Sequence, residues 1–411
     1  MYSMPKNFKS FNVLLPLALL LFPPSLSAVG WVSQISGTIN DLRAVHFPMD
    51  AQTGYAVGAN GTILKTTNGG TNWVSQTPVT SNTLMSLYFP VDALTGDVVG
   101  DMADTILKTT NGGTTWVSQT SGVTNFLQSV YFPVNAQTGY AVGNFGTILA
   151  TTDGGTNWVK QTSGTFFNLY SVHFPMDALT GYAVGGNSRT GTILKTTNGG
   201  ASWDSLYSGT SSYLMSVQFP VDAQTGYTMG ANGTILKTTD GGASWVNQTS
   251  WTPNGLQSVH FPVDALTGYA VGFSGTILKT TDGGANWVSQ ISGTPNSLCS
   301  VHFPVDTLTG YAVGLNGTIL KTTNGGIGVE QQPIERLVSE TVGQFKALPN
   351  PFLLFAVIPG YENEAFVAYD IAGRRVGSYK GNRVGWDLKP GVYFLKPAGK
   401  DAKPVRVVKV Q

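Results

Sequence analysis

The sequence predicts an all-β protein built from repeated units, and three observations lead to that expectation. Glycine is abundant, with 51 of 411 residues, while charged residues make up only 11%, against about 25% in an average soluble domain. The 41% of hydrophobic residues is enough to supply a core. A short motif, T-x-D/N-G-G, recurs seven times, and short β-branched runs alternate with turn residues between its copies.

The repeat has a period of about 42 residues, which is typical of propellers and solenoids. The steps between successive tryptophans, starting from Trp31, are 42, 43, 42, 45, 42 and 42 residues. Those that follow the first six motifs are Trp73, Trp116, Trp158, Trp203, Trp245 and Trp287. The Asp/Asn position of the motif is filled by Asn68, Asn111, Asp153, Asn198, Asp240, Asp282 and Asn324.

Each period reads as four strands. From Trp245 onward, WVNQTS, LQSVHFP, YAVG and TILKTT each fit a strand, and VDALTG and FSG fit turns. Units of this kind suit propeller blades, whereas a linear solenoid would need capping repeats, and none is visible. The pattern ends at Val329, so we expect the strand after Trp31 to complete the last blade. Residues 29–329 are therefore predicted to form a seven-bladed β-propeller.

The first 28 residues have the composition of a signal peptide. Lys6 and Lys9 precede the apolar run FNVLLPLALLLF, and PPSLSA then supplies a helix break and small residues. The apolar run is too short to span about 30 Å of hydrocarbon as a helix, and no later stretch is longer. We therefore expect export after cleavage following Ala28 and no transmembrane anchor.

The recurring motif has the residues of a turn. An Asp or Asn side chain accepts hydrogen bonds from backbone N–H groups of its own turn, and the two glycines permit positive φ. Four of the seven copies carry Asn, which cannot serve as a general base or an anionic ligand. The motif is therefore expected to be structural. The Asp of the F-P-x-D turn, for example Asp264 or Asp306, is interpreted in the same way because Asn135 replaces it once; calcium at such turns is the alternative.

These segments resemble the Asp-box, or bacterial neuraminidase repeat. The longer unit, with GYAVG, GTILKTT and DGGANW, resembles the propeller family that includes the photosystem II assembly factor, over about residues 31–329. The resemblance implies that the box is a hairpin between two strands of a blade. It also raises assembly-factor activity as a possible function, although a shared fold is weak support for it.

Two kinds of catalytic chemistry are alternatives for the propeller. Sialidases, which also carry Asp-boxes, use an arginine triad and a Tyr/Glu pair, but residues 29–329 contain only Arg43 and Arg189 and no glutamate. A polysaccharide-active hydrolase that uses aspartates is the remaining enzyme alternative. Asp101 and Asp104 share one short loop of the second blade and are weak candidates for a cation site, against simple drift of one repeat.

The histidines and the single cysteine are interpreted as packed strand residues. His46, His173, His260 and His302 occupy one equivalent position, which Tyr88, Tyr131 and Gln218 fill in the other blades. We expect them to be dispersed around the propeller axis and not to hold one ion. Cys299 excludes an intramolecular disulfide and is expected to be buried.

The copies differ mainly in the loops of one face. Strands of a blade alternate in direction, so the box and the VDALTG turn share one face, and the blade-to-blade loops share the other. Variable loops on a rigid scaffold suit partner binding. The candidate ligand-binding residues on this second face are Phe126, Phe145, Phe167, Arg189, Tyr213, Trp251 and Phe273. Ordinary loop packing of these side chains is the alternative.

Composition changes after Val329. Residues 330–344 read as a charged linker, and 345–411 contain LPNPF, YDIAGRRV, GWDLKPGVYF and VRVVKV. These motifs resemble the C-terminal sorting domain of the type nine secretion system, which implies recognition by outer-membrane secretion machinery. A small Ig-like β-sandwich is expected here, with Trp386, Tyr393 and Phe394 available for its core. A plain fibronectin-like spacer is the alternative.

Together these features predict an exported, non-catalytic binding scaffold of a Gram-negative type bacterium, secreted or held at the cell surface. The expected partner is a protein or a glycan. The net charge of +1 gives no reason to expect nucleic acid, and neither a cofactor nor a metal is predicted. We expect the protein to be a monomer.

Overall fold

The computed structural model describes residues 30–102, 105–327, 356–357, 364–370, 373–381, 383–385, 387–398 and 405–409. The chain divides into two compact units, Met1–Val329 and Glu330–Gln411, and each is described by itself. The predicted signal peptide (1–28), the predicted linker (330–344), the LPNPF segment, Asp104 and Trp386 lie outside the described residues.

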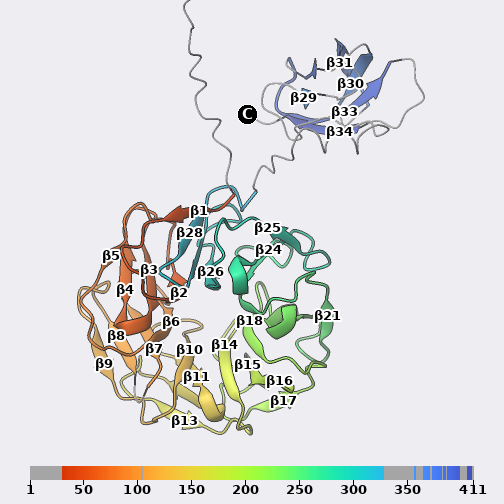
Figure 1. The fold of residues 1–411 in the computed structure, drawn as a ribbon. Helices are drawn as coiled ribbons and strands as arrows, with labels where there is room; N and C mark the ends of the chain where they lie inside the picture. Colours follow the sequence, from red (N-terminus) through yellow and green to blue (C-terminus); the bar gives the residue numbers. More distant parts are fainter. Residues whose placement is uncertain are drawn as a thin grey trace, which may run out of the picture. The chain divides into compact units, whose positions relative to one another are not determined.

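The first unit is a ring of seven four-stranded antiparallel sheets (Figure 1). Blade one contains β2 (Leu42–His46), β3 (Gly54–Gly58), β4 (Ile63–Thr66) and β5 (Val74–Ser75). Blade two contains β6 (Leu84–Tyr88), β7 (Gly96–Gly100), β8 (Ile106–Thr109) and β9 (Val117–Gln119). Blade three contains β10 (Leu127–Tyr131), β11 (Gly139–Gly143), β12 (Ile148–Thr151) and β13 (Val159–Gln161).

The remaining blades follow the same order. Blade four contains β14 (Asn168–His173), β15 (Gly181–Asn187), β16 (Thr190–Thr196) and β17 (Asp204–Leu206). Blade five contains β18 (Leu214–Gln218), β19 (Gly226–Gly230), β20 (Ile235–Thr238) and β21 (Val246–Gln248). Blade six contains β22 (Leu256–His260), β23 (Gly268–Gly272), β24 (Ile277–Thr280) and β25 (Val288–Gln290). Blade seven contains β26 (Leu298–His302), β27 (Gly310–Gly314), β28 (Ile319–Thr322) and β1 (Val32–Gln34). Four short 3-10 turns, η1 (Ala59–Gly61), η2 (Asn144–Gly146), η3 (Ala231–Gly233) and η4 (Phe273–Gly275), join second and third strands.

The amino-terminal strand closes the ring. β1 pairs with β28, and Val32 lies opposite Lys321. Trp31, directly before β1, is 1% exposed; its Nε1 donates to Gln290 Oε1 at 2.9 Å and its ring meets Phe303 edge-on at 5.9 Å. The structure therefore confirms the prediction that the strand after Trp31 completes the last blade. The first unit is a seven-bladed β-propeller.

Burial follows the position of a strand within its blade. Second strands such as β3 are buried along their whole length, whereas outer strands such as β25 are exposed at their first two residues. Second strands have sheets packed on both faces, so their apolar runs (GYAVG) do not alternate with polar residues. The core therefore lies between blades and not at the propeller axis.

A repeated contact joins each blade to the next. In six seams, the tyrosine of a second strand stacks on the phenylalanine of the following blade, as Tyr311 does on Phe47 at 3.9 Å. Its hydroxyl donates across the seam to two backbone carbonyls, those of Ala51 and Gly69, at 2.9 and 3.0 Å. Equivalent stacks join Tyr55–Phe89, Tyr140–Phe174, Tyr182–Phe219, Tyr227–Phe261 and Tyr269–Phe303.

The T-x-D/N-G-G motif, which resembles the Asp-box, is a turn that places one of these carbonyls. Asp282 Oδ1 accepts from Thr280 Oγ1 and from the Asn286 backbone N–H, both at 2.9 Å, and Thr280 Oγ1 accepts from Gly284 N. These hydrogen bonds, first from the Asn286 side chain and backbone, lower the pKa of the Asp282 carboxyl. Asn68 accepts equivalent bonds from Thr66 and Asn72. Asn and Asp are interchangeable here because both supply the Oδ1 acceptor. The second side-chain atom adds a bond four residues further on, which Asp282 Oδ2 accepts from Asn286 and Asn111 Nδ2 donates to Thr115.

The F-P-x-D turns follow the same logic. Asp264 Oδ1 accepts from the backbone N–H groups of Leu266 and Thr267 at 2.9 and 2.8 Å. Asn135 accepts the same two bonds in blade three. Both turns are therefore closed by an Asx side chain bonded to the backbone two and three residues further on.

Blade two lacks the tyrosine of the seam. Asp97 stands in its place, is fully buried, and neither carboxylate oxygen has a hydrogen-bond partner within the described residues. Burial raises the pKa of Asp97 to about 7, partly offset by the positive charge of Lys108. The seam between blades two and three therefore lacks the tyrosine stack and the hydroxyl bonds that the other six contain.

The second unit is a small all-β structure. Its main sheet has the order β31 (Arg375–Lys380), β30 (Ala365–Tyr369), β33 (Gly391–Pro397), β34 (Val405–Lys409), and β29 (Ala356–Val357) pairs with β32 (Arg383–Val384). Phe366, Tyr379, Leu395 and Val407 form its core, and Tyr393 packs against them. Phe394, which the sequence suggested for this core, is only half-buried. Within the described parts of both units, no helix is long and apolar enough to cross a membrane.

Replacing Trp31 by Ala tests the ring closure. We expect a loss of about 3–5 kcal/mol in the free energy of unfolding, because a fully buried tryptophan is removed from the closing strand. Val32→Ala, on the exposed side of the same strand, is the control and should cost much less. Chemical denaturation of the two variants checks this, and equal costs would contradict it.

Replacing Asp97 by Tyr should stabilise the protein by restoring the missing stack and hydroxyl. The gain should be larger at pH 8 than at pH 5. A pKa raised from 3.8 to about 7 means that Asp97 destabilises the folded state increasingly between those pH values, as it must ionise while buried. Tyr140→Asp, which creates the same defect in the next seam, should destabilise. A gain that is the same at both pH values would refute the assignment.

Candidate partner-binding face

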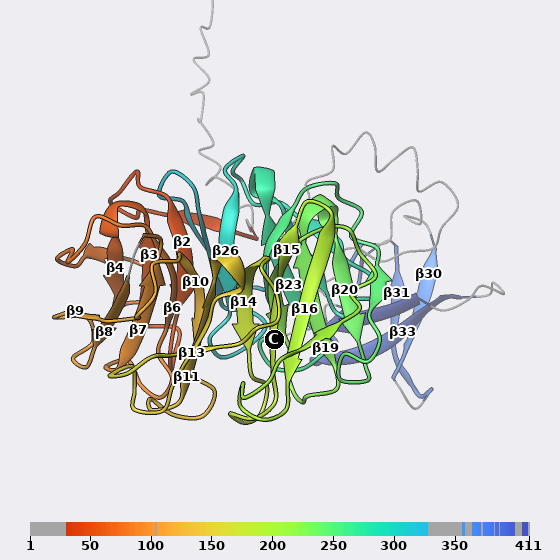
Figure 2. The same ribbon diagram turned by 90° about the horizontal axis from the view of Figure 1, so that it is seen from below.

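The two faces of the propeller carry different loops. Neighbouring strands in each blade are antiparallel, so blade-to-blade loops and the turns between second and third strands lie on one face, which we call the loop face. The Asp-boxes and F-P-x-D turns lie on the opposite face, the box face. Figure 2 shows the disc from the side, with the strands running between the two faces.

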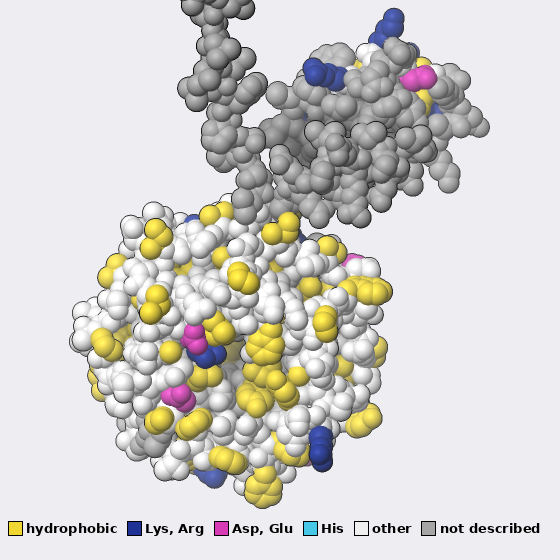
Figure 3. All heavy atoms as spheres, in the orientation of Figure 1, with side chains coloured by type: hydrophobic (Ala, Val, Ile, Leu, Met, Phe, Trp, Pro, Cys, Tyr) yellow, Lys and Arg dark blue, Asp and Glu magenta, His cyan; other side chains and the backbone are white. Residues whose placement is uncertain are grey.

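The innermost strands bring one side chain from every blade to a pocket at the axis. Each of these side chains belongs to the residue directly after the first leucine of its strand, at the end of the strand that lies near the loop face. We call this pocket the channel mouth; it has a volume of about 110 Å³ and is lined by Arg43, Met85, Gln128, Tyr170, Met215, Gln257 and Cys299. Figure 3 shows one face of the propeller with hydrophobic side chains near its centre and few charged ones.

Arg43 gives the channel mouth its positive charge. Its guanidinium pairs with Asp41 at 3.2 Å and donates to Cys299 Sγ at 3.9 Å. Asp41 Oδ1 in turn accepts from the backbone N–H of Asn316 at 3.0 Å. Arg43 Nε is buried without a hydrogen-bond partner among the described residues. The pair is therefore anchored to blade seven and leaves the buried Nε–H of Arg43 unused.

Cys299 belongs to this pocket, so the prediction that it is buried was only partly right. It is half-buried, and burial raises the pKa of its thiol, against the lowering effect of the nearby Arg43 charge. A thiol with a raised pKa is a poor nucleophile at neutral pH. The cysteine contributes to the lining of the pocket.

Three of the four histidines are in contact, which corrects the expectation that they are dispersed. The ring of His302 lies 4.8 Å from those of both His46 and His260, and Tyr131 lies 4.9 Å from His173. Although the blades radiate from the axis, their innermost strands approach closely enough for neighbouring side chains to touch.

The histidines bind backbone and not a metal ion. His46 Nδ1 accepts the backbone N–H of Phe89 at 3.2 Å, and His260 Nδ1 accepts that of Phe303 at 3.1 Å. His302 and His173 make the same bond to Phe47 and Phe219. A neutral histidine that accepts at Nδ1 carries its proton on Nε2, which leaves no free nitrogen for a metal. Among the described residues no group of three His, Cys, Asp or Glu side chains is placed to hold a metal.

Burial keeps these histidines neutral. It lowers the pKa of His46 and of His173 to about 3 and that of His260 to about 4, and it also lowers that of His302. For His46, His173 and His302, the charge of His260 is a second, smaller cause. The ring of side chains at the axis is therefore a packed structural feature at neutral pH.

The loop face contains the candidate residues predicted from the sequence, but it spreads them over several blades. Phe145 and Phe273 lie in η2 and η4, Phe126 and Phe167 flank blade three, and Arg189 lies in the β15–β16 turn. Tyr213 packs against Tyr170 of the channel mouth at 6.0 Å. Trp251 is the most exposed of the aromatic candidates, at 84%. Tyr213 thus lies beside the channel mouth, and the other six candidates lie on loops and turns around it.

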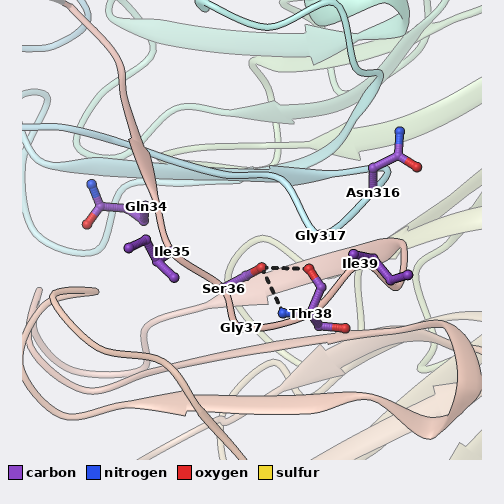
Figure 4. Close-up of a pocket in the computed structure, with 8 residues that line it drawn as sticks. All are labelled: Gln34, Ile35, Ser36, Gly37, Thr38, Ile39, Asn316 and Gly317. Atoms are coloured by element: carbon purple, nitrogen blue, oxygen red, sulfur yellow. Dashed lines mark hydrogen bonds between the residues drawn. The ribbon is translucent and has the colours of Figure 1, made fainter.

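Sequence reasoning missed two features of this face. The channel mouth was overlooked although its residues stand at the one variable position of an otherwise nearly constant L-x-S-V run, which was the available signal. The rim residues Ile35 and Ile39 are both 86% exposed and line a groove of about 610 Å³ on blade seven with Gly37, Asn316 and others. Figure 4 shows these two isoleucines on either side of the turn in which Ser36 Oγ bonds Thr38.

Asp101, one of the weak candidates for a cation site, closes a loop. Its Oδ1 accepts the backbone N–H of Thr83 at 2.6 Å, and its backbone carbonyl accepts from Thr105. The carboxylate therefore joins the blade-to-blade loop to the β7–β8 turn. Asp104, the other candidate, lies outside the described residues.

Comparisons with known proteins agree with this architecture. Residues 201–298 match the family model described as Photosynthesis system II assembly factor YCF48. The structure of YCF48 bound to D1 peptide is 20% identical, with a TM-score of 0.60, over 72% of this chain and 97% of that chain. The structure of YCF48 from Cyanidioschyzon merolae is 20% identical, with a TM-score of 0.60, over 71% of this chain and 98% of that chain. The structure of the RRP9 WD40 repeats is 10% identical, with a TM-score of 0.60, over 72% of this chain and 97% of that chain. No curated protein matches the sequence.

These likenesses support a propeller of the neuraminidase-repeat type. The three matched structures share the propeller fold with this chain. The WD40 structure, at half the sequence identity, superposes as well as the two YCF48 structures, so structural likeness by itself does not distinguish among the functions of propellers. The family-model match covers part of the propeller and agrees with the resemblance seen in its repeats.

The histidine ring predicts a specific dependence of stability on pH. Above pH 6.5 the histidines are neutral in both states, and their contribution is constant. As pH falls from about 6.5 towards 3, the unfolded chain takes up protons that the folded ring cannot accept, so the free energy of unfolding decreases.

The control is His302→Gln, since Gln218 fills this position in blade five and accepts from Phe261 N at 2.7 Å. The variant should lose less stability than the unmodified protein between pH 7 and pH 4.5. Urea denaturation at the two pH values measures this. An identical loss in both proteins would show that His302 does not titrate as argued.

Proposed function

We propose that this protein is a non-catalytic scaffold that binds a protein or glycan partner through the loop face of its propeller. The observation that carries the proposal is the concentration of exposed aromatic side chains and of the channel mouth on this one face. Exposed aromatic residues on a rigid scaffold supply contact area at little conformational cost. The box face, in contrast, uses its polar side chains to close turns.

The relatives give this proposal further support. A part of the propeller matches an assembly-factor family, and one similar structure is that of YCF48 bound to D1 peptide. Binding of a peptide by a propeller of similar fold is consistent with the open loop face proposed here. The same relatives favour a non-enzymatic role over the alternative of a polysaccharide-active hydrolase.

We further propose that the protein is exported and then sorted by its carboxyl-terminal domain to the outside of the cell. The signal-peptide composition of residues 1–28 and the motifs of residues 345–411 support this. In this proposal the second unit contacts outer-membrane secretion machinery, and the propeller, acting as a monomer, faces the surroundings.

Deleting residues 345–411 tests the sorting role. The truncated chain should remain inside the cell envelope, because it lacks the motifs that the secretion machinery would recognise. Cell fractionation of the producing bacterium measures this, with the full chain as the control. Normal surface delivery of the truncated chain would favour a plain spacer.

Replacing Trp251, Phe167 and Arg189 together by Ala tests the binding face. Binding to polysaccharides in a panel and to proteins captured from the surface of the producing cells should fall by about 10-fold or more, because aromatic anchors carry most of the energy of such contacts. The matched control replaces Val134, Leu179 and Leu266, which are exposed on the box face, by Ala. Equal binding by the two variants would refute the loop face, and release of sugars from the panel would favour the hydrolase.

A further inference from the structure

The loop face carries a groove that recurs at the rim of more than one blade. In each case, the outer strand and the loop that follows it form one wall, and the turn between second and third strands forms the other. On blade seven these walls are Gln34–Ile39 and Asn316–Gly317 (Figure 4). On blade five the equivalent residues are 247–253 and 232–234, and the groove there has a volume of about 530 Å³.

Trp251 occupies a position in the blade-five groove that favours glycine. Its φ is +56°, in the left-handed region that a bulky side chain adopts only with strain. Five of the other blade-to-blade loops have a glycine in this conformation, with φ between 69° and 74°. These glycines are Gly37, Gly122, Gly164, Gly209 and Gly293.

Neither the turn nor packing requires this tryptophan. Ser250 Oγ bonds Thr252 O at 3.2 Å, as Ser292 bonds Thr294 O at 3.1 Å in a sister loop that has glycine. A side chain built on Gly293 would meet no atom within 4 Å, so the position faces open space. Trp251 is 84% exposed. A strained, exposed indole that the fold does not use points to a role in binding.

The groove around Trp251 is lined by amide and hydroxyl groups without charge. Asn232, Asn247, Gln248 and Thr249 contribute to it. Asn247 makes no side-chain hydrogen bond to any described residue, and Asn232 uses only its Nδ2, towards Ser212 at 3.3 Å. Amides offer both donors and acceptors, which suits hydroxyl groups better than charged or apolar ligands.

The sister groove on blade seven makes the contrast clear. There, Ile35 and Ile39 stand where blade five has Thr249 and Pro253, and Gly37 stands where it has Trp251. The blade-five groove has therefore exchanged two aliphatic side chains and a glycine for a polar side chain, a proline and a flat aromatic ring. An aromatic plane beside uncharged amides matches a pyranose ring, whose C–H face is apolar and whose edge carries hydroxyls.

We infer that the blade-five groove binds a neutral sugar unit of a polysaccharide, with the sugar ring stacked on Trp251 and its hydroxyls bonded by Asn232, Asn247 and Gln248. This inference rests on the proposed function and names the ligand class for one part of the loop face. The absence of charge among these lining residues favours neutral over acidic polysaccharides, and the narrow set of polar groups favours a sugar over a protein segment.

Trp251→Gly is the decisive variant because it restores the residue of the sister loops. It should lower affinity for a neutral polysaccharide by about 10-fold or more while leaving the melting temperature unchanged or raised, since strain is relieved. Affinity electrophoresis of the full chain in gels containing mannan, xyloglucan or dextran, with alginate as the acidic comparison, measures this. Trp251→Phe should bind with intermediate affinity.

Gly293→Trp, made in the Trp251→Gly background, is the control for a bare exposed indole. It places a tryptophan at the equivalent position of blade six, where Ser274 and Ser289 stand in place of Asn232 and Asn247. Since the two amides are missing there, this variant should not recover the affinity that Trp251→Gly loses.

Two results would overturn the inference. One is the absence of retardation by every neutral polysaccharide in the panel, and the other is equal retardation of the Trp251→Gly variant and the unmodified protein. Suppose that one of these two results is found, and that the variant with Trp251, Phe167 and Arg189 all replaced by Ala no longer binds a surface protein that the unmodified protein captures. The glycan site is then refuted, whereas the proposed binding role of the loop face is supported. If the triple variant retains every partner, the proposed function fails as well.

Discussion

The contact between one blade and the next is the interaction on which the propeller depends. Each four-stranded sheet buries both faces of its second strand, and it does so only because a neighbouring blade covers them. The stacked pair Tyr311–Phe47 joins blade seven to blade one in the same way as the five other pairs join their blades. The tyrosine hydroxyl reaches a carbonyl of the next Asp-box, so the box is part of the seam as well as a turn.

This arrangement explains why the box face is uniform. The positions of the Asp-boxes and of the F-P-x-D turns are fixed by hydrogen bonds within a blade and across a seam. A substitution there disturbs two blades. At Asp97 a seam residue has changed its chemistry, and the result is a buried carboxyl whose pKa is raised to about 7. The loop face lacks the tyrosine bonds, although backbone bonds such as that from Gly61 N to Asn82 O, at 2.8 Å, tie its turns to the blade-to-blade loops.

Packing between blades also determines which positions of each innermost strand can vary. In the L-x-S-V run of the innermost strands, the leucine and valine enter the core and the variable position faces the channel mouth. The serine bonds the next blade, as Ser258 Oγ does with the backbone of Val301 at 3.3 Å. Most of these variable positions face solvent, and the buried Asp97 and the His/Tyr/Gln position at the axis are exceptions. Trp251 is the strongest example, because it replaces a glycine that the turn itself favours.

The sequence by itself determined the repeat, the number of blades, the four strands of each and the role of the Asp-box, because these depend on local periodicity and on turn residues that act within a few positions. It also placed Trp31 in the closing blade by counting. Only the tertiary structure decided what meets at the axis: the contacts among His46, His260 and His302, and the channel mouth around Arg43, join residues as many as 256 positions apart. The distance between innermost strands is set by how seven twisted sheets pack into a ring, and no local pattern encodes it. In the same way, the left-handed φ of Trp251 is a property of the folded loop, visible only when that loop is compared with its sisters in space.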